Sequence, residues 1–278
     1  MSISQINEHV PEEIINHIFT FLSPKALCKA KGVCKEWERL ASDERLWNAF
    51  DLARLFPSLK IIDGAVWNKY AGICVDDEPT LDRYTEIKRL TKLFATLHIE
   101  GDAGITRFTL PKGLTFKILK ELAKSPKEGN RTNLRISWMA VLEKLGDTPV
   151  ENTRILYITN NVLKNTKGQP IKAVVNHVNG LGYRITEALP TAALSILTYI
   201  SSDGETPPPY DHDFARTSDM INGYHVVIGG LNSPDLDAFI DVRGCDRIGF
   251  GAQQEAATTT STSRSLWQRI VNFWPLKA

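Results

Sequence analysis

The sequence lacks an excess of either charge. It has 33 lysines and arginines against 32 aspartates and glutamates in 278 residues, with no long run of one sign. Proteins that hold nucleic acid or an anionic membrane by electrostatics present a basic surface. The composition therefore gives no reason to expect a nucleic-acid-binding protein.

Cysteine is also scarce. The chain has Cys28, Cys34, Cys74 and Cys245, with no C-x-x-C pair and no spacing typical of a metal site. We therefore expect no metal and no cofactor, and a reducing cytosol fits this cysteine usage. Because Cys28 and Cys34 lie among the apolar residues of the N-terminal helices described below, we expect them to be buried thiols rather than a disulfide.

Long apolar runs and internal repeats are missing as well. No stretch approaches the ~20 consecutive apolar residues of a membrane-spanning helix, so we expect no transmembrane segment. The N-terminus has no basic region followed by an apolar core, so we expect no cleavable secretory signal. No repeat of ~20 to 50 residues is present, which argues against a solenoid or propeller. The length suggests about two domains, at ~150 residues each.

The most informative stretch is residues 10–47. Pro11 suits the start of a helix because its ring presets φ and it has no N–H to satisfy, and Glu12 and Glu13 favour the first turn. Apolar residues then follow at i, i+1, i+4, i+5 and i+8, which places them on one stripe of a helix: Ile14, Ile15, Ile18, Phe19 and Leu22. The pattern predicts a helix from Pro11 to Leu22.

Two shorter helices are predicted next. One runs from Pro24 to Lys31 with inward-facing alanines and a leucine, and the other carries Val33, Trp37 and Leu40. Three helices this short bury little apolar area among themselves. Their large side chains exceed what such a core can absorb, so we expect these helices to dock on a partner protein.

The same residues resemble the F-box family. Its pattern has a Leu-Pro opening, an Ile/Leu-rich first helix, a middle Leu, a Val-Cys-Lys-x-Trp segment and a closing Leu-Trp. In this chain these elements are Val10-Pro11, Ile14-Ile15-x-x-Ile18-Phe19-x-x-Leu22, Leu27, Val33-Cys34-Lys35-Glu36-Trp37 and Leu46-Trp47. Val10 replaces the usual Leu. An ordinary helical subdomain with these residues in its core is the alternative.

The resemblance implies docking onto the Skp-family adaptor of a Skp–cullin–F-box ubiquitin ligase, and through it onto a cullin. It implies that the partner-binding residues are Pro11, Ile14, Ile15, Ile18, Phe19, Leu22, Leu27, Val33, Cys34, Trp37, Leu40, Leu46 and Trp47.

The remainder of the chain suggests a second domain. We expect an F-box at residues 1–50, a helical connector at 51–80, an α/β target-recognition domain at 81–251, and a low-complexity tether with an amphipathic tail at 252–278. Together these make an α+β multidomain protein. In the region 81–251 strands and helices alternate, which favours an α/β layer arrangement with some parallel strand pairing. The patterns predict strands at 105–110, 155–158, 183–185, 224–228 and 238–242, and helices at 87–97, 114–124, 134–145, 171–178 and 190–200.

A second resemblance covers most of residues 1–251. Several segments are similar to the region after the F-box in proteins of amoeba-infecting, Parachlamydia-type bacteria. Two of them are Phe56-Pro57-Ser58-Leu59-Lys60-Ile61-Ile62-Asp63 and Val226-Val227-Ile228-Gly229-Gly230. Those proteins are not characterised, so the resemblance implies a setting and not a chemistry. That setting is a secreted bacterial effector in the host cytoplasm; otherwise we expect a cytoplasmic protein.

Candidate catalytic groups are few. Tyr210-Asp211-His212-Asp213 places two carboxylates around an imidazole, but in a polar loop after three prolines, where we expect solvated side chains. Cys74 or Cys245 could act as a thiol nucleophile with His177 or His225 as its base, yet nothing in the sequence brings these residues together. We therefore expect no enzyme, and a domain that presents an unknown target protein. Two alternatives stay open: a catalytic second domain, or a scaffold without a role in ubiquitination.

Overall fold

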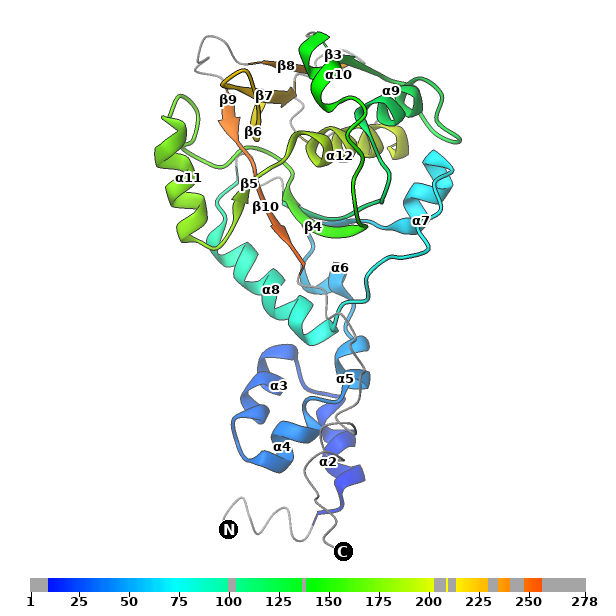
Figure 1. Ribbon diagram of the computed structural model, residues 1–278. Helices are drawn as coiled ribbons and strands as arrows, with labels where there is room; N and C mark the ends of the chain where they lie inside the picture. The colour runs from blue at the N-terminus through cyan, green and yellow to red at the C-terminus, as the bar shows by residue number, and fades with distance from the viewer. Residues whose placement is uncertain are drawn as a thin grey trace, which may run out of the picture. The chain divides into compact units, whose positions relative to one another are not determined.

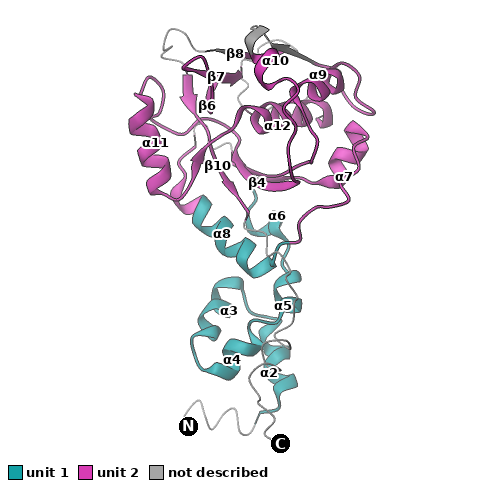
Figure 2. Cartoon of the chain, viewed as in Figure 1, with its two compact units in different colours: residues 1–57, 81–93 teal, residues 58–80, 94–278 magenta. Residues whose placement is uncertain are grey.

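The computed structural model describes residues 10–99, 104–136, 139–202, 209, 214–229, 235–240 and 248–256 (Figure 1). These residues belong to two compact units. The first is drawn from residues 1–57 and 81–93, and the second from residues 58–80 and 94–278 (Figure 2). A helical N-terminal region is followed by a mixed α/β domain with two sheets, which confirms the predicted fold class.

The first unit is built of short helices. They are α2 (Glu12–Phe19), α3 (Pro24–Lys31), α4 (Lys35–Leu40), α5 (Glu44–Asn48), α6 (Leu52–Leu55) and the first part of α8 (Arg83–Thr96). Side chains at the helix starts satisfy free backbone N–H groups. Ser23 Oγ accepts from Ala26 N at 3.3 Å before α3, and Asp43 and Asp51 cap α5 and α6 in the same way.

The structure revises the predicted helices of this unit in detail. The helix predicted to reach Leu22 ends at Phe19, and the helix predicted to carry Val33 begins only at Lys35. The short helix α5 was not predicted, and the short helix α6 falls at the start of the predicted helical connector. Their apolar residues fall within only one or two turns, which is too short for a helical period to be visible.

The second unit contains two five-stranded sheets. The first has the order β1-β2-β4-β10-β5, with β1 (Leu59–Ile62), β2 (Ile105–Leu110), β4 (Arg154–Thr159), β10 (Ala252–Glu255) and β5 (Arg184–Ile185). The second has the order β3-β8-β7-β6-β9, with β3 (Asn133–Ile136), β8 (Asp235–Ile240), β7 (Tyr224–Gly229), β6 (Phe214–Ile221) and β9 (Ile248–Phe250).

Parallel and antiparallel pairing are mixed, as predicted. The pairs β1–β2, β3–β8 and β6–β9 are parallel, and the other neighbours in both sheets are antiparallel. Strands β7 and β8 follow each other in the chain and pair antiparallel.

Helix α12 (Ala188–Ser201) lies at the centre of this unit, between β4 and β7 in the view of Figure 1. It is apolar on nearly every side, as is typical of a helix buried all round. Its residues share one core with strands of both sheets: Leu156 and Ile158 from β4, Leu194 and Ile196 from α12, Val226 and Ile228 from β7. The other helices of the unit are α7 (Gly64–Val66), the π-helix η1 (Trp67–Ala71), α9 (Phe116–Lys124), α10 (Met139–Leu145) and α11 (Ile171–Gly180).

Three predicted segments are corrected. The predicted helix at 134–145 is strand β3 followed by helix α10, because residues 133–136 pair with β8. The predicted connector at 51–80 is not purely helical: residues 58–80 belong to the second unit and contribute strand β1 at the edge of its first sheet. The predicted tail does not begin at residue 252, since β10 lies between β4 and β5. The tether at 256–263 and the amphipathic end lie outside the described residues except for Ala256.

Candidate protein-docking surface

Helix α2 has two apolar faces with opposite environments. The side chains of Ile15 and Phe19 are buried in the first unit, whereas Ile14 is 50% exposed, Ile18 51% and Phe21 75%. Residues at i, i+4 and i+7 lie on one side of a helix. Phe21 follows the last helical residue but keeps a helix-like turn, since its N–H donates to Ile18 O at 3.1 Å. We call Ile14, Ile18 and Phe21 the apolar ridge.

Helix α2 is held against α4 by one aromatic and one charged contact. Phe19 packs edge-on against Trp37 with ring centroids 5.4 Å apart. Arg39, at the end of α4, donates to Glu12 Oε2 at 2.6 Å at the start of α2, and this hydrogen bond raises the pKa of the guanidinium. Both groups are largely exposed, so the pair orients the two helices more than it stabilises them.

The ridge also has a local contact of its own. The rings of His17 and Phe21 meet edge-on at 5.1 Å between centroids. This contact limits the rotamer freedom of the exposed Phe21 ring.

The far side of the unit is closed by Trp47. Its Nε1 donates to Ala41 O at 2.8 Å, and its ring lies 4.6 Å from that of Tyr84, at the start of α8. Lys31 Nζ lies 3.8 Å from the Tyr84 ring centroid, a cation–π contact. Residues 81–93 therefore complete the helical unit.

The structure divides the predicted partner-binding residues into three groups. Buried side chains are those of Ile15, Phe19, Leu27, Leu40, Leu46 and Trp47; partly exposed ones are those of Leu22, Cys34 and Trp37; exposed ones are those of Pro11, Ile14, Ile18 and Val33. Buried side chains cannot reach a partner while the unit stays folded, so their role is to position the exposed ones. Contact between the exposed residues and a partner stays a prediction.

Two features differ from the sequence analysis. Phe21 was missed as a docking residue, although its i+7 spacing from Ile14 could have identified it. The expectation of buried thiols is wrong for Cys28, which is exposed, while Cys34 is half-buried; neither forms a disulfide. Cys28 lies one position after the buried Leu27, on a part of the helix that faces solvent.

Comparison with known families decides what this unit is. A family model described as F-box-like matches residues 8–53. The chain contains an F-box-like domain. The match covers α2 to α5 and the start of α6, and it includes the whole apolar ridge. The F-box-like domain supports a role as an F-box adaptor in ubiquitin ligase complexes. No solved structure matches the chain.

The candidate catalytic residues of the second unit are not brought together in the described part of the chain. Cys74 Sγ lies 4.0 Å from Asn68 Oδ1, and its contacts there include neither His177 nor His225. His225 Nδ1 lies 2.8 Å from Thr217 O, so its ring bonds to the backbone of the neighbouring strand. Cys245 and the segment 210–213 lie outside the described residues.

Among the described residues, no three or more histidine, cysteine, aspartate or glutamate side chains gather in a way that could hold a metal ion. In the same residues, no helix combines the length and the apolar character needed to cross a membrane.

Proposed function

We propose that this protein is a substrate adaptor of a Skp–cullin–F-box ubiquitin ligase. In this proposal the F-box-like domain docks on the Skp-family adaptor, and the α/β unit presents a target protein for ubiquitination. The observation that carries the proposal is the apolar ridge on α2, exposed within the segment that matches the F-box-like model.

The ridge has the character of an interface centre. Specific protein interfaces bury ~1,200 to 2,000 Å² in total, and a few anchors dominate their energy. Completing the burial of a half-exposed isoleucine contributes roughly 1 kcal/mol, given about 1.5–3 kcal/mol for full burial. Ile14 and Ile18 are such residues, and Phe21 has still more area to lose.

The rest of the assembly is also part of the proposal. The α/β unit has no catalytic role here, because transfer of ubiquitin belongs to other subunits of the ligase. From the sequence resemblance alone we also propose a secreted bacterial effector that works in the host cytoplasm; without secretion, the proposed site of action is the cytoplasm of the producing cell.

Affinity purification of the full chain from a eukaryotic lysate tests the proposal. The parent chain should recover the Skp-family adaptor and a cullin, and an Ile14→Asp, Ile18→Asp double variant should recover neither. The matched control is Ile118→Asp, because Ile118 is a similarly exposed isoleucine on α9 of the second unit. Recovery of the adaptor without a cullin would favour a scaffold, and recovery of neither by the parent chain would refute the proposal.

A further inference from the structure

A cavity of about 320 Å³ lies in the second unit, beside the start of α12. One wall is apolar and includes Leu110, Phe116, Val150, Leu189 and Pro190. The polar lining holds three carboxylates, Glu151, Glu187 and Asp219, against one guanidinium, Arg154. The cavity is thus amphipathic, with more negative than positive charge.

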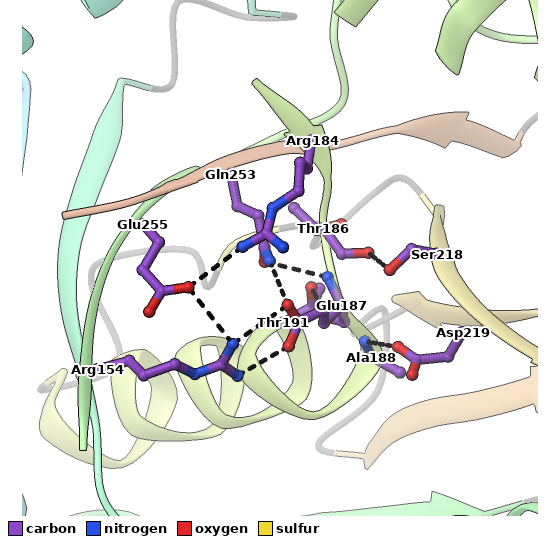
Figure 3. Close-up of polar contacts among 10 residues, drawn as sticks. All are labelled: Arg154, Arg184, Thr186, Glu187, Ala188, Thr191, Ser218, Asp219, Gln253 and Glu255. Carbon is purple, nitrogen blue, oxygen red and sulfur yellow. Dashed lines mark hydrogen bonds and ion pairs between the residues drawn. The ribbon is translucent and has the colours of Figure 1, made fainter. Parts of the chain in front are cut away.

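Most of the charged side chains next to the cavity pair with one another (Figure 3). Arg154 Nη2 donates to Glu187 Oε2 at 2.8 Å, and its Nη1 lies 3.8 Å from Glu255 Oε2. Burial disfavours the charge on Arg154, but its hydrogen bonds to Glu187 and the charge of Glu255 outweigh that penalty and raise the pKa of the guanidinium. Gln253 of β10 donates from Nε2 to Glu187 Oε1 at 2.8 Å. Both carboxylate oxygens of Glu187 therefore already accept hydrogen bonds.

Asp219 is the exception. It comes from β6, and its Oδ2 accepts from Ala188 N at 2.6 Å, at the first turn of α12 (Figure 3). This helix-capping contact uses one of its two oxygens, and Asp219 forms no ion pair with any described residue. Burial raises the pKa of its carboxyl, in spite of the hydrogen bond from Ala188. Arg154, which is already paired with Glu187, offsets this effect only in part. A mostly buried carboxylate without an ion pair of its own is unfavourable, and a bound cation would relieve this cost.

We propose that this cavity recognises a basic side chain, arginine or lysine, of the target protein. Its alkyl stem packs on the wall that contains Phe116 and Leu189, and its cationic head meets Asp219. The inference rests on the proposed function, because it supplies the chemistry by which the second unit selects a target.

Other occupants fit the lining less well. An anion would face the carboxylates of Glu151 and Asp219 with Arg154 already engaged. A purely apolar group would cover Asp219 without compensating its charge. Arginine and lysine combine a long apolar stem with a charged end, which matches the two halves of the cavity.

Degenerate peptide pools test this inference on the immobilised full chain. Each pool consists of capped heptapeptides whose central residue is fixed as Arg, Lys, Gln or Glu, with the six flanking positions randomised among uncharged residues. Retained peptides are quantified by mass spectrometry. We expect the Arg or the Lys pool to be retained at least about tenfold better than the Gln and Glu pools, the ratio for one hydrogen-bonded charge pair.

Variants locate the preference in the cavity. Asp219→Asn keeps the shape and the acceptor for Ala188 N, and it should abolish the preference. Glu121→Gln, which changes an exposed carboxylate on α9, should keep it. Equal retention of the Gln pool, or an unchanged preference in Asp219→Asn, would overturn the inference. Binding of N-acetyl-arginine amide that depends on Asp219, without binding of any basic pool, would also overturn it, because the site would then serve a small ligand.

The same proteins separate this inference from the proposed function. Asp219→Asn should recover the Skp-family adaptor as well as the parent chain does. Loss of the basic-peptide preference with adaptor recovery intact is the expected result for this variant. Failure of the parent chain to recover the adaptor refutes the ligase role, whereas failure of the parent chain to prefer basic peptides refutes only the cavity assignment.

Discussion

Ile14 and Ile15 are neighbours in the chain, yet the side chain of Ile14 is 50% exposed and that of Ile15 only 4%. Successive residues on a helix point about 100° apart, so two adjacent isoleucines can serve different surfaces. On α2 one isoleucine faces the core of the F-box-like domain and the other faces solvent. The pair therefore places a core residue and a solvent-exposed residue at adjacent positions, and the proposed docking role falls on the exposed one.

We predict that substitutions at these two residues have very unequal effects on stability. Ile15→Ala removes buried methyl groups and should lower the free energy of unfolding by about 2–5 kcal/mol. Ile14→Ala should change it by no more than about 0.5 kcal/mol, as at other exposed positions. Denaturant unfolding followed by helical circular dichroism measures both. Equal destabilisation by the two substitutions would contradict the two-faced description of α2.

Phe21 should act as a docking anchor although the sequence analysis missed it. Phe21→Ala removes the most exposed large side chain of the ridge and should weaken binding to a purified Skp-family adaptor by about tenfold or more. Its melting temperature should match that of the parent chain, because the ring is not part of the core. Unchanged affinity would remove Phe21 from the docking surface.

Gly104 and Gly113 provide a matched test of close packing in the second unit. Both have positive φ, +77° and +80°. A Cβ added at Gly104 would overlap the carbonyl oxygen of Ser58, next to the pairing of β1 with β2, whereas one added at Gly113 would meet no atom within 4 Å. We expect Gly113→Ala to cost about 1–2 kcal/mol from backbone strain, and Gly104→Ala to cost at least about 2 kcal/mol more. Chemical denaturation of both variants measures the difference, and similar costs would contradict the close approach at Ser58.

The raised pKa of Asp219 predicts a pH-dependent effect on stability. A carboxyl whose pKa is raised by folding contributes most favourably below its unfolded pKa, and this contribution is lost as pH rises through the folded value. The Asp219→Asn variant has no carboxyl that titrates at this position, so its free energy of unfolding loses no such contribution as pH rises. Its melting temperature, relative to the parent chain, should therefore increase from about pH 4 to about pH 7.5. A constant difference for Asp219→Asn across this pH range would contradict the burial of this charge.

The sequence predicted the elements whose pattern is long or strongly periodic. The period of Ile14, Ile15, Ile18 and Phe19 identified α2, and alternation identified β2. The spacing did not distinguish the core face from the exposed face of α2, because isoleucines occupy both. Only burial in the folded unit separates Ile15 from Ile14 and Ile18.

The elements that were missed depend on partners distant in the chain. Strand β10 reads Ala-Gln-Gln-Glu, with little intrinsic preference for a strand. It forms because it pairs with β4 on one side and β5 on the other, and because Gln253 bonds to Glu187. The contact between Asp219 and the start of α12 likewise joins residues 31 positions apart in the chain, which no local pattern predicts.

The most direct test of the central claim is the dissociation constant of the full chain for a purified Skp-family adaptor, measured by calorimetry for the parent chain, Ile18→Ala and Ile118→Ala. Both isoleucines lie on helices and are similarly exposed, at 51% and 45%, but only Ile18 lies in the F-box-like domain. We predict that Ile18→Ala weakens binding by at least about 1 kcal/mol, or about fivefold, while Ile118→Ala binds like the parent chain. Equal affinity of all three proteins, or no binding by the parent chain, would contradict the assignment of the apolar ridge as the docking surface.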